Sequence, residues 1–360
     1  MNAKLVEIIR REIQERGPQP FAWFMEQALY HPEHGYYSND RAAIGRQGDY
    51  FTNISVGPLF GQLLAIQFAE IRERTGIDRF SVVEQGAHHG EFARDVLEFS
   101  QGRFPEFFSA LNYRIVEPFP KLRDRQKQTL REFGDRVQWC ASLTELEPFV
   151  GIHFSNELLD SMPINLPNKL VGLDGETFVF LDSPNEHPAN QSQLDWITTV
   201  AAKLDRGVVL AVDYGFIAAE FREMVQVRAK HRLLDSPFEE IGEADITAHI
   251  NWTDIAKTAE KNGLRVIGFT DQHHFLTGII ESFGRGGSAE SPANASPAWT
   301  DWGQSPLPSN FKSQRQLQTL LHPEMLGRSF QVLAMTKDID LAPPLSGFKF
   351  GRDAREALGL

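Results

Sequence analysis

The spacing of hydrophobic positions changes along the chain and divides it into regions. Apolar residues from Leu5 to Ile13 recur at helical spacing, which predicts an amphipathic helix at the start. A second apolar segment, residues 20–38, ends in a turn rich in Pro, Gly and Tyr. From Pro58 the spacing is helical again. We therefore expect residues 1–75 to form an N-terminal extension of helices and loops.

From Phe80 onward, short apolar runs alternate with segments of helical spacing. Seven runs are expected to be sheet strands: "FSVVEQG", "NYRIVEP", "RVQWC", "VGIHF", "DRGVVLAVDYG", "LRVIGFTD" and "GRSFQVLAMTK". "TFVFLD" is expected in a hairpin beside the sheet. Strands separated by helices imply right-handed crossovers. The pattern predicts an α/β fold with a seven-stranded, mostly parallel sheet and helices on both faces.

The same pattern gives a domain organisation. Residues 76–215 are expected to form the first part of the core. Residues 216–250 are polar and are expected to form a helical insertion over the active face. Residues 251–338 would complete the core, including a Gly-, Ser- and Pro-rich flexible loop at 284–310. Residues 339–360 would be a C-terminal tail.

Composition narrows the class of protein. The chain has 360 residues, a net charge of −12 and no Lys/Arg block, so we expect no nucleic-acid partner. A single cysteine, Cys140, excludes an internal disulfide framework and cysteine-clustered zinc. No apolar run is long enough to span a bilayer, and the first residues resemble neither a secretory nor a transit signal. A cytoplasmic enzyme is predicted.

Ligands of parallel sheets bind at the carboxyl ends of the strands, so those positions hold the candidate chemistry. The first strand ends at Glu84, and a loop with Gly86 and Gly90 at its ends leads into a helix. Backbone N–H groups of such a loop can face an anionic ligand, although many simple turns look alike. Glu117 ends the next strand, where an acid can accept both hydroxyls of a ribose. Together, loop and acid favour a nucleoside ligand.

Two further polar clusters follow later strands. "SNELLDSMP" places Asn156, Glu157 and Asp160 just past the fourth strand, and Asp213 ends the fifth. These side chains are candidates for substrate binding or catalysis. The alternative is local, with Asn156 capping a short turn and Glu157 favouring its positive end.

Several ordered motifs resemble the MidA-like family of S-adenosylmethionine-dependent methyltransferases. They span nearly the whole chain: "HPEHGYYS", "GDYFTNISVGPLFGQ", "VEQGAHHGEFARDVL", "YRIVEPFPKLRDRQ", "SNELLDSMPI", "DYG", "ADITAHINWTDIAKTAEKNGL", "DQHHFL" and "FQVLAMTK". Mitochondrial members of that family are protein arginine methyltransferases that assist complex I assembly. The resemblance implies a class I methyltransferase fold and S-adenosylmethionine as cofactor. It also implies a protein substrate, with a respiratory-complex subunit as one candidate, and leaves the oligomeric state open.

The resemblance assigns roles to particular residues. Cofactor binding is expected from one set: Asp49, Thr52, Glu84, Gly86, His88, Gly90 and Glu117. Catalysis is expected from a second set: Asn156, Glu157, Asp160 and Asp213. Glu157 and Asp160 would orient a guanidinium and offset its repulsion from the sulfonium of the cofactor, with Asn156 and Asp213 in support.

The chain departs from the family pattern at two places. His88 replaces the central glycine of the Gly-Pro-Gly-x-Gly loop, and "TNIS" at 52–55 replaces Thr-Ser-Pro-Glu. The first departure favours an alternative function, a non-catalytic assembly factor that keeps the methyltransferase fold. His88 and His89 lack a His-x-x-x-His or Cys partner, so no metal site is predicted. A histidine-metal hydrolase is the third hypothesis, after the methyltransferase and the non-catalytic assembly factor.

Overall fold

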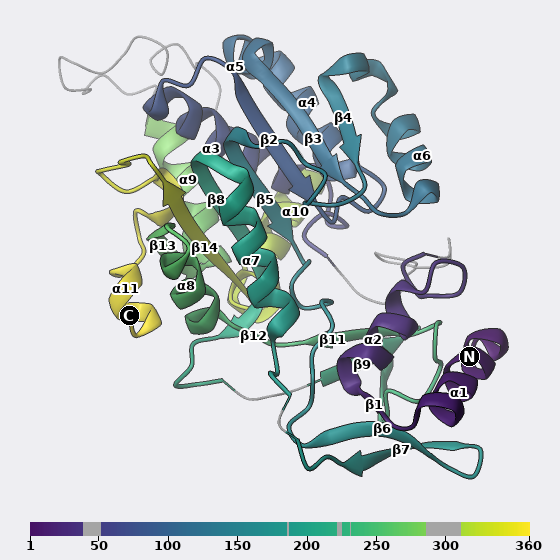
Figure 1. Cartoon of the computed structure of the whole chain (residues 1–360). Helices are drawn as coiled ribbons and strands as arrows, with labels where there is room; N and C mark the ends of the chain where they lie inside the picture. Colours follow the sequence, from purple (N-terminus) through teal and green to yellow (C-terminus); the bar gives the residue numbers. More distant parts are fainter. Residues whose placement is uncertain (39–51, 186, 222–224, 231, 286–310) are drawn as a thin grey trace.

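The computed structural model describes residues 1–38, 52–185, 187–221, 225–230, 232–285 and 311–360. Figure 1 shows a larger part built around a long twisted sheet and a smaller part that carries the N-terminus. Asp49 and residues 286–310 of the predicted flexible loop lie outside the described residues. Within the described residues, no helix is both long and apolar enough to cross a membrane.

Seven strands cross the main sheet in the order β13, β14, β8, β5, β2, β3, β4. Their bounds are β2 (Phe80–Gln85), β3 (Leu111–Val116), β4 (Val137–Cys140), β5 (Phe149–Asn156), β8 (Leu204–Phe216), β13 (Arg265–Asp271) and β14 (Phe330–Lys337). From β8 to β4 all neighbours are parallel, whereas β14 is antiparallel to both β8 and β13. The short strand β12 (Ile250–Asn251) also pairs with β8. The predicted seven-stranded, mostly parallel sheet is confirmed.

Helices cover both faces of this sheet. One face packs against α3 (Leu59–Thr75), α4 (Glu91–Arg103), α9 (Gln272–Arg285) and α10 (Phe311–Leu321), and the other against α7 (Gln191–Lys203), α8 (Trp252–Lys261) and α11 (Ala354–Leu358). The segments α5 (Pro105–Ala110), α6 (Pro120–Thr129) and η1 (Arg131–Arg136) flank β3 and β4. Val82 packs into one apolar cluster and its neighbour Val83 into the other. Burial on both faces explains why the central strands β2, β5 and β8 contain long apolar runs.

The smaller part is assembled from three separated stretches of chain. Its elements are α1 (Ala3–Arg16), β1 (Gln19–Pro20), α2 (Phe21–Tyr30), β6 (Lys169–Asp174), β7 (Thr177–Asp182), β9 (Val225–Ala229), β10 (Arg232–Leu234) and β11 (Asp245–Ala248). They form two three-stranded sheets, β1-β6-β7 and β10-β9-β11, around an apolar core of their own. The hairpin predicted at "TFVFLD" is β6 with β7.

Two expected boundaries need correction. Residues 216–250 were predicted to be helical, but the described part of that segment contains the strands β9, β10 and β11. These strands are only three to five residues long and carry charged side chains. The alternation of apolar and polar residues was therefore too short to predict a strand. The predicted extension at 1–75 is also divided, because α1 and α2 belong to the smaller part whereas α3 packs on the main sheet.

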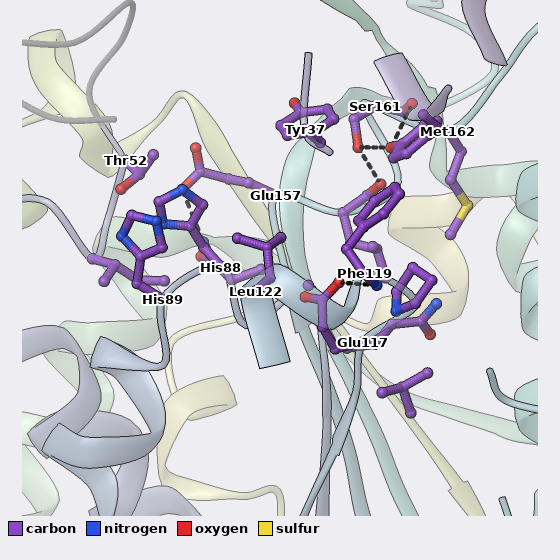
Figure 2. Close-up of a pocket in the computed structure, with 18 of the residues that line it drawn as sticks. Tyr37, Thr52, His88, His89, Glu117, Phe119, Leu122, Glu157, Ser161 and Met162 are labelled. Carbon is purple, nitrogen blue, oxygen red and sulfur yellow. Dashed lines mark hydrogen bonds between the residues drawn. The ribbon is translucent and has the colours of Figure 1, made fainter. Parts of the chain in front are cut away.

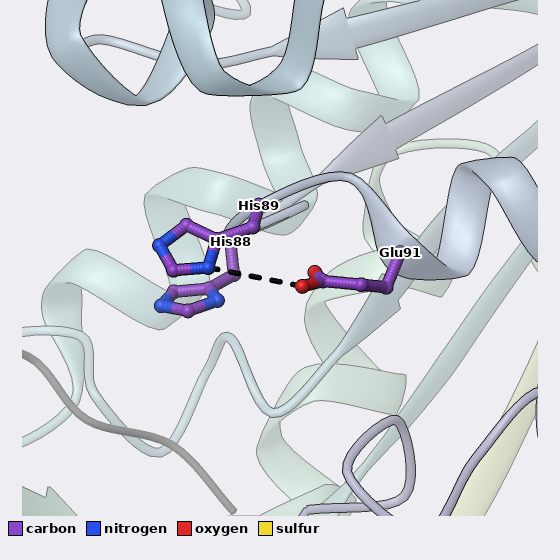
Figure 3. Close-up of side chains that lie close together, drawn as sticks. All are labelled: His88, His89 and Glu91. Atoms are coloured by element: carbon purple, nitrogen blue, oxygen red, sulfur yellow. Dashed lines mark ion pairs between the residues drawn. The ribbon is translucent and has the colours of Figure 1, made fainter. Parts of the chain in front are cut away.

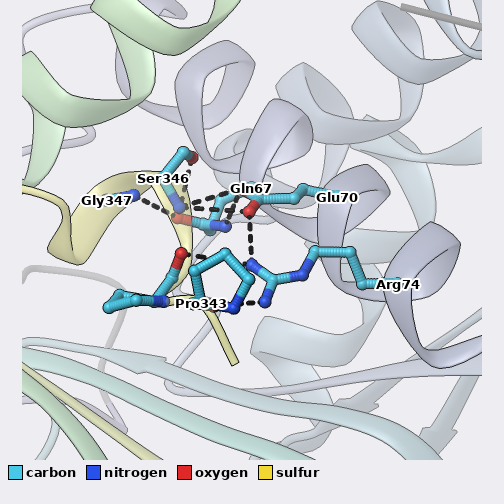
Figure 4. A network of polar contacts seen from close by, with 7 residues as sticks. Gln67, Glu70, Arg74, Pro343, Ser346 and Gly347 are labelled. Carbon is cyan, nitrogen blue, oxygen red and sulfur yellow. Dashed lines mark hydrogen bonds and ion pairs between the residues drawn. The ribbon is translucent and has the colours of Figure 1, made fainter. Parts of the chain in front are cut away.

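The C-terminal tail is fastened to α3 (Figure 4). Gln67 accepts a hydrogen bond from the backbone N–H of Gly347 at 2.9 Å, and Glu70 accepts from that of Ser346 at 3.1 Å. Arg74 bonds to Glu70 and to the carbonyl of Pro343. These contacts hold the segment η4 (Ser346–Phe348) against the first face of the main sheet. A short π-helical turn, η3 (Pro323–Gly327), precedes β14.

The strand order creates a crevice at the carboxyl ends of the central strands. After β2 the chain crosses over to β3 on one side, whereas β5 pairs with β2 on the other side. The loops after β2 and β5 therefore diverge, and the space between such loops is where doubly wound sheets bind ligands.

Candidate active site

A cavity of about 720 Å³ opens at the carboxyl ends of β2, β3 and β5. Its walls come from the loops after these strands, from the turn at residues 52–55, and from Glu26, Tyr30 and Tyr37 of the smaller part. Figure 2 shows the side chains of His88 and Glu157 on one side of the cavity and those of Glu117 and Phe119 on another. The volume falls within the range of small-molecule sites.

The loop after β2 keeps a glycine-like backbone despite its histidines. Gly86, His88 and Gly90 all have positive φ, of 84°, 45° and 84°. Histidine is one of the non-glycine residues that adopts this region more readily than most. The substitution at position 88 therefore leaves the turn intact and adds an imidazole to the cavity wall. Gly90 lies at the start of α4 and does not line the cavity itself.

His88, His89 and Glu91 form a compact cluster (Figure 3), with ligand-type atoms within 4.8 Å of one another. Arg125 reaches His89 Nε2 at 2.8 Å, and Glu91 lies 3.7 Å from His89 Nδ1. A guanidinium only donates, so Nε2 of His89 accepts and the ring proton is on Nδ1, toward Glu91. Burial, His89 and Arg125 lower the pKa of His88. A metal ion would compete with Arg125 for His89, and the expectation of no metal site remains a prediction.

Glu117 lies at the end of β3 and its carboxyl faces the cavity. Its Oε1 accepts from the backbone N–H of Phe119 and its Oε2 from Nε2 of Gln126, both at 3.0 Å. Gln126 also donates to the carbonyl of His88 at 2.8 Å, so it ties the loop after β2 to the acid. Burial raises the pKa of Glu117 to about 7. Gln126 was not predicted, because a polar residue on an exposed-looking helix gives no local signal.

The loop after β5 brings Asn156 and Glu157 to the cavity. Glu157 has a φ of 52° and donates its backbone N–H to the carbonyl of Val212 at 3.0 Å. Its Oε1 accepts from Asn156 Nδ2 at 2.8 Å and from the backbone N–H of Asn53 at 3.2 Å. Burial raises the pKa of Glu157 to about 8, and the charge of Asp213 adds to the effect.

Asp213 and Asp160 lie behind this loop and do not line the cavity. Asp213 is fully buried, and its Oδ2 accepts from the backbone N–H groups of Leu158 at 3.0 Å and Leu159 at 2.8 Å. It therefore holds the loop in shape. Asp160 is also buried, and burial together with the charge of Asp213 raises its pKa. Among the predicted catalytic residues, Asn156 and Glu157 reach the cavity.

The predicted cofactor-binding residues also divide into those that line the cavity and those that do not. Thr52, Gly86, His88 and Glu117 line the cavity. Glu84 does not, because its carboxyl lies in the core and accepts a hydrogen bond of 2.7 Å from the hydroxyl of Tyr113. Burial raises the pKa of Glu84 to about 8. The sequence could not show that the side chain of Glu84 points into the core, because β2 is buried on both faces and its residues do not alternate between apolar and polar.

The smaller part contributes an aromatic wall that the sequence did not identify as part of the site. Tyr30 lies parallel to Phe119, with ring centroids 6.4 Å apart, and its hydroxyl donates to Ser161 Oγ at 2.9 Å. Tyr37 donates to Asp245 Oδ1 at 2.7 Å. The only hint in the sequence was the Tyr-rich turn, whose contact with the sheet depends on tertiary packing.

The chain matches the family described as "Putative S-adenosyl-L-methionine-dependent methyltransferase" over residues 63–192 and 185–270. The matched residues make up more than half of the chain. The chain belongs to this family. It is an S-adenosylmethionine-dependent methyltransferase, as the sequence motifs predicted.

Curated relatives are similar over most of the methyltransferase. The mitochondrial protein arginine methyltransferase NDUFAF7 homolog of Drosophila melanogaster is 25% identical over 391 residues, with 93% of this chain and 85% of that protein covered. NDUFAF7 of Homo sapiens is 24% identical over 322 residues, with 74% of this chain and 70% of that protein covered. The MidA-like resemblance is thereby confirmed.

A solved structure matches the whole fold. It is a "likely methyl transferase" from Burkholderia thailandensis bound to S-adenosyl-homocysteine, with a TM-score of 0.83 and 27% identity. The alignment covers 99% of this chain and 97% of that one. The smaller part of the methyltransferase is therefore shared with that structure and is not peculiar to this chain.

The predicted cytoplasmic location is contradicted by these relatives. The NDUFAF7 proteins of fly, worm, frog and human are all named as mitochondrial. The sequence argument rested on the character of the first residues, which does not decide where an enzyme of this family works.

The cavity suits the cofactor of the family. Glu26, Glu91, Glu117 and Glu157 line it, whereas no Lys or Arg does so among the described residues. Cavities lined by one sign of charge attract ligands of the other sign. A cavity lined by carboxyl groups without a compensating cation, with a left-handed loop at the end of β2 and an acid at the end of β3, fits the sulfonium and the ribose of S-adenosylmethionine.

Proposed function

We propose that this methyltransferase acts on an arginine side chain of a protein and that Glu157 orients the guanidinium. The observation that carries the proposal is the lining of the cavity, where Glu157 is half-buried beside other carboxyl groups and no Lys or Arg lies on the wall among the described residues. A guanidinium is the planar cation that carboxylates bind best. The names of the curated relatives, protein arginine methyltransferases, support the same acceptor.

In this proposal the cofactor is held by the residues that line the cavity near β2 and β3. The backbone at Gly86 and His88 would hold the methionine end, Glu117 would accept the ribose hydroxyls, and Thr52 would close the side of the cavity. S-adenosylmethionine supplies a methyl group that is already activated by its sulfonium. The protein therefore contributes mainly by aligning donor and acceptor.

Glu157 and Asn156 would act on the acceptor. An ionised Glu157 offsets the repulsion between the guanidinium and the sulfonium, and it can take up the proton that the methylated nitrogen loses. A bound cation lowers the pKa of a nearby carboxyl, so substrate binding itself would ionise Glu157. Asp213 and Asp160 would support this loop from behind.

The test is methyl transfer from radiolabelled S-adenosylmethionine to a mitochondrial protein extract, followed by mass spectrometry of the labelled peptides. We expect methylarginine, with a respiratory-complex subunit as the partner that the resemblance implies. Glu157→Gln should lower the rate by about 100-fold or more while leaving S-adenosylhomocysteine affinity within about threefold. Label found only on lysine or on small molecules would contradict the proposed acceptor.

Cofactor binding is tested separately by calorimetric titration with S-adenosylmethionine and S-adenosylhomocysteine. Glu117→Ala should weaken both ligands by about 10- to 100-fold, because hydrogen bonds to a charged acceptor are lost. Folded wild-type protein that binds neither ligand would favour the non-catalytic alternative, in which His88 obstructs the cavity.

A further inference from the structure

The turn at residues 52–55 places a buried asparagine beside Glu157. Thr52 and Ser55 close the turn on each other, since the backbone N–H of each donates to the hydroxyl of the other at 2.9 Å. Asn53 lies between them and is 0% exposed. Ordinary turn asparagines are solvated, so the burial of this one points to a role behind the wall of the cavity, which its neighbours Thr52, Ile54 and Ser55 line.

Asn53 makes two contacts with the loop after β5. Its backbone N–H donates to Glu157 Oε1 at 3.2 Å, and its side-chain Nδ2 donates to Asn156 Oδ1 at 3.0 Å. Asn156 in turn donates from Nδ2 to Glu157 Oε1 at 2.8 Å. The three residues therefore form a closed triangle of hydrogen bonds.

The direction of these bonds is fixed by the chemistry of one donor. A backbone N–H can only donate, so Oε1 of Glu157 must accept when the contact with Asn53 is made. Because Asn53 Nδ2 holds the oxygen of the Asn156 amide, the nitrogen of that amide is turned to the same Oε1. No hydrogen bond or ion pair reaches Oε2 of Glu157 from the described part of the chain.

We propose that Asn53 is a positioning residue that commits Oε1 of Glu157 to the protein and leaves Oε2 as the oxygen that exchanges a proton for a substrate cation. This inference rests on the proposed function, because it assigns the contact with the guanidinium to one atom of Glu157. It also gives a purpose to "TNIS", where the family commonly has Thr-Ser-Pro-Glu.

The surroundings of Glu157 explain why such positioning matters. Asp213 on β8, Asp245 on β11 and Asp160 on its own loop all face it, and Tyr214 on β8 lies near the same group. All of these are acids, so nothing in this set compensates a negative charge on Glu157. The two donors on Oε1 are then the main protein contribution that favours the ionised form, and a ligand cation at Oε2 supplies the rest.

The experiment compares the titration of Glu157 in variants of Asn53. Carboxyl-¹³C-labelled glutamate is followed by NMR across the pH range, and the Glu157 signal is assigned by its loss in Glu157→Gln. Asn53→Ala removes the hydrogen bond that orients the side-chain amide of Asn156. We therefore expect the pKa of Glu157 to rise by about one pH unit. Asn53→Leu keeps the volume and adds no charge but cannot donate to Asn156, so a similar rise is expected.

Asn165→Ala is the matched control. The side chain of Asn165 also makes two hydrogen bonds, from the backbone N–H of Ala22 and to the carbonyl of Pro188, but neither involves Glu157. The titration of Glu157 should be the same in this variant as in the wild type. S-adenosylhomocysteine affinity within about threefold of wild type shows that each variant is folded.

Two outcomes decide the matter. If Glu157 titrates in both Asn53 variants as it does in Asn165→Ala, the positioning role is wrong. If Asn53→Ala does not fold, the titration of Glu157 in Asn53→Leu decides alone. The titration needs no substrate, so its result is independent of whether arginine is the acceptor. Failure to methylate arginine with the expected titration would instead reject the proposed function and leave the role of Asn53 in place.

Discussion

Position 88 carries a histidine in a backbone conformation suited to glycine, with a φ of 45°. The sequence showed the substitution but not its consequence, because the conformation depends on the loop as a whole. Sequence position was a better guide for Glu117 and Glu157, which follow buried strands and line the cavity. It could not show that Asp213 turns inward to bond the backbone of the preceding loop.

Residues that come to the site from a distance had no signal of their own. Gln126 reaches Glu117 from the next helix, and Asn53 reaches Glu157 from more than a hundred residues away. Neither belongs to a pattern with a fixed spacing from its partner. Hydrogen bonds of this kind follow from the packing of finished elements, and a periodic pattern contains no information about them.

Glu84 supports a prediction at the residue scale. Its folded pKa is raised to about 8 by burial, whereas an unfolded glutamate titrates near ~4.3. Between these values the folded state holds the extra proton, so the unfolding free energy falls by about 1.4 kcal/mol per pH unit from this group as pH rises. Glu84→Gln should remove this part of the slope, measured by denaturant unfolding at pH 5, 6, 7 and 8.

The exposed residue Glu106 provides the control. Glu106→Gln removes a carboxyl that is not buried and should keep the slope of the wild type. A Glu84→Gln protein whose unfolding free energy depends on pH as strongly as the wild type would show that the buried carboxyl is not the source.

At the scale of elements, the sequence was reliable where an element is long and buried. All seven strands of the main sheet were predicted close to their observed bounds, because each contains buried apolar residues and is separated from the next strand by a helical segment or a turn. The strands β9, β10 and β11 were missed, because each is short and its partner strands carry polar side chains. The stabilising contacts of such strands are with α1 and α2, which lie far away in the sequence.

The attachment of the C-terminal tail to α3 gives a prediction at this scale. Gln67 is fully buried and accepts from the backbone N–H of Gly347, and it donates to Glu70 at 2.7 Å. Gln67→Ala leaves both groups without that partner and should cost about 1–3 kcal/mol of unfolding free energy. Gln62→Ala, on the same helix but without a hydrogen bond to the tail, should cost less than about 0.5 kcal/mol. Equal losses in thermal or denaturant unfolding would show that the tail contacts contribute nothing specific.

At the scale of the whole molecule, the cavity belongs to both parts. The loops at Gly86 and Glu117 come from the main sheet, whereas Glu26, Tyr30 and Tyr37 come from the smaller part. The smaller part is itself built from three separated stretches, two of them inserted between strands of the main sheet. Its role in the site follows from that interleaving, which no contiguous motif displays.

A ligand in the cavity should therefore affect both parts. We expect S-adenosylhomocysteine to slow amide exchange by about tenfold or more in the loop 86–90 and also in α2, measured by hydrogen exchange and mass spectrometry. The second effect follows because Tyr30 of α2 lies parallel to Phe119, next to the acid expected to bind the ribose. The strand β13, at the far edge of the sheet, is the internal control and should be unaffected. Protection confined to the loop would mean that the smaller part does not respond to the cofactor.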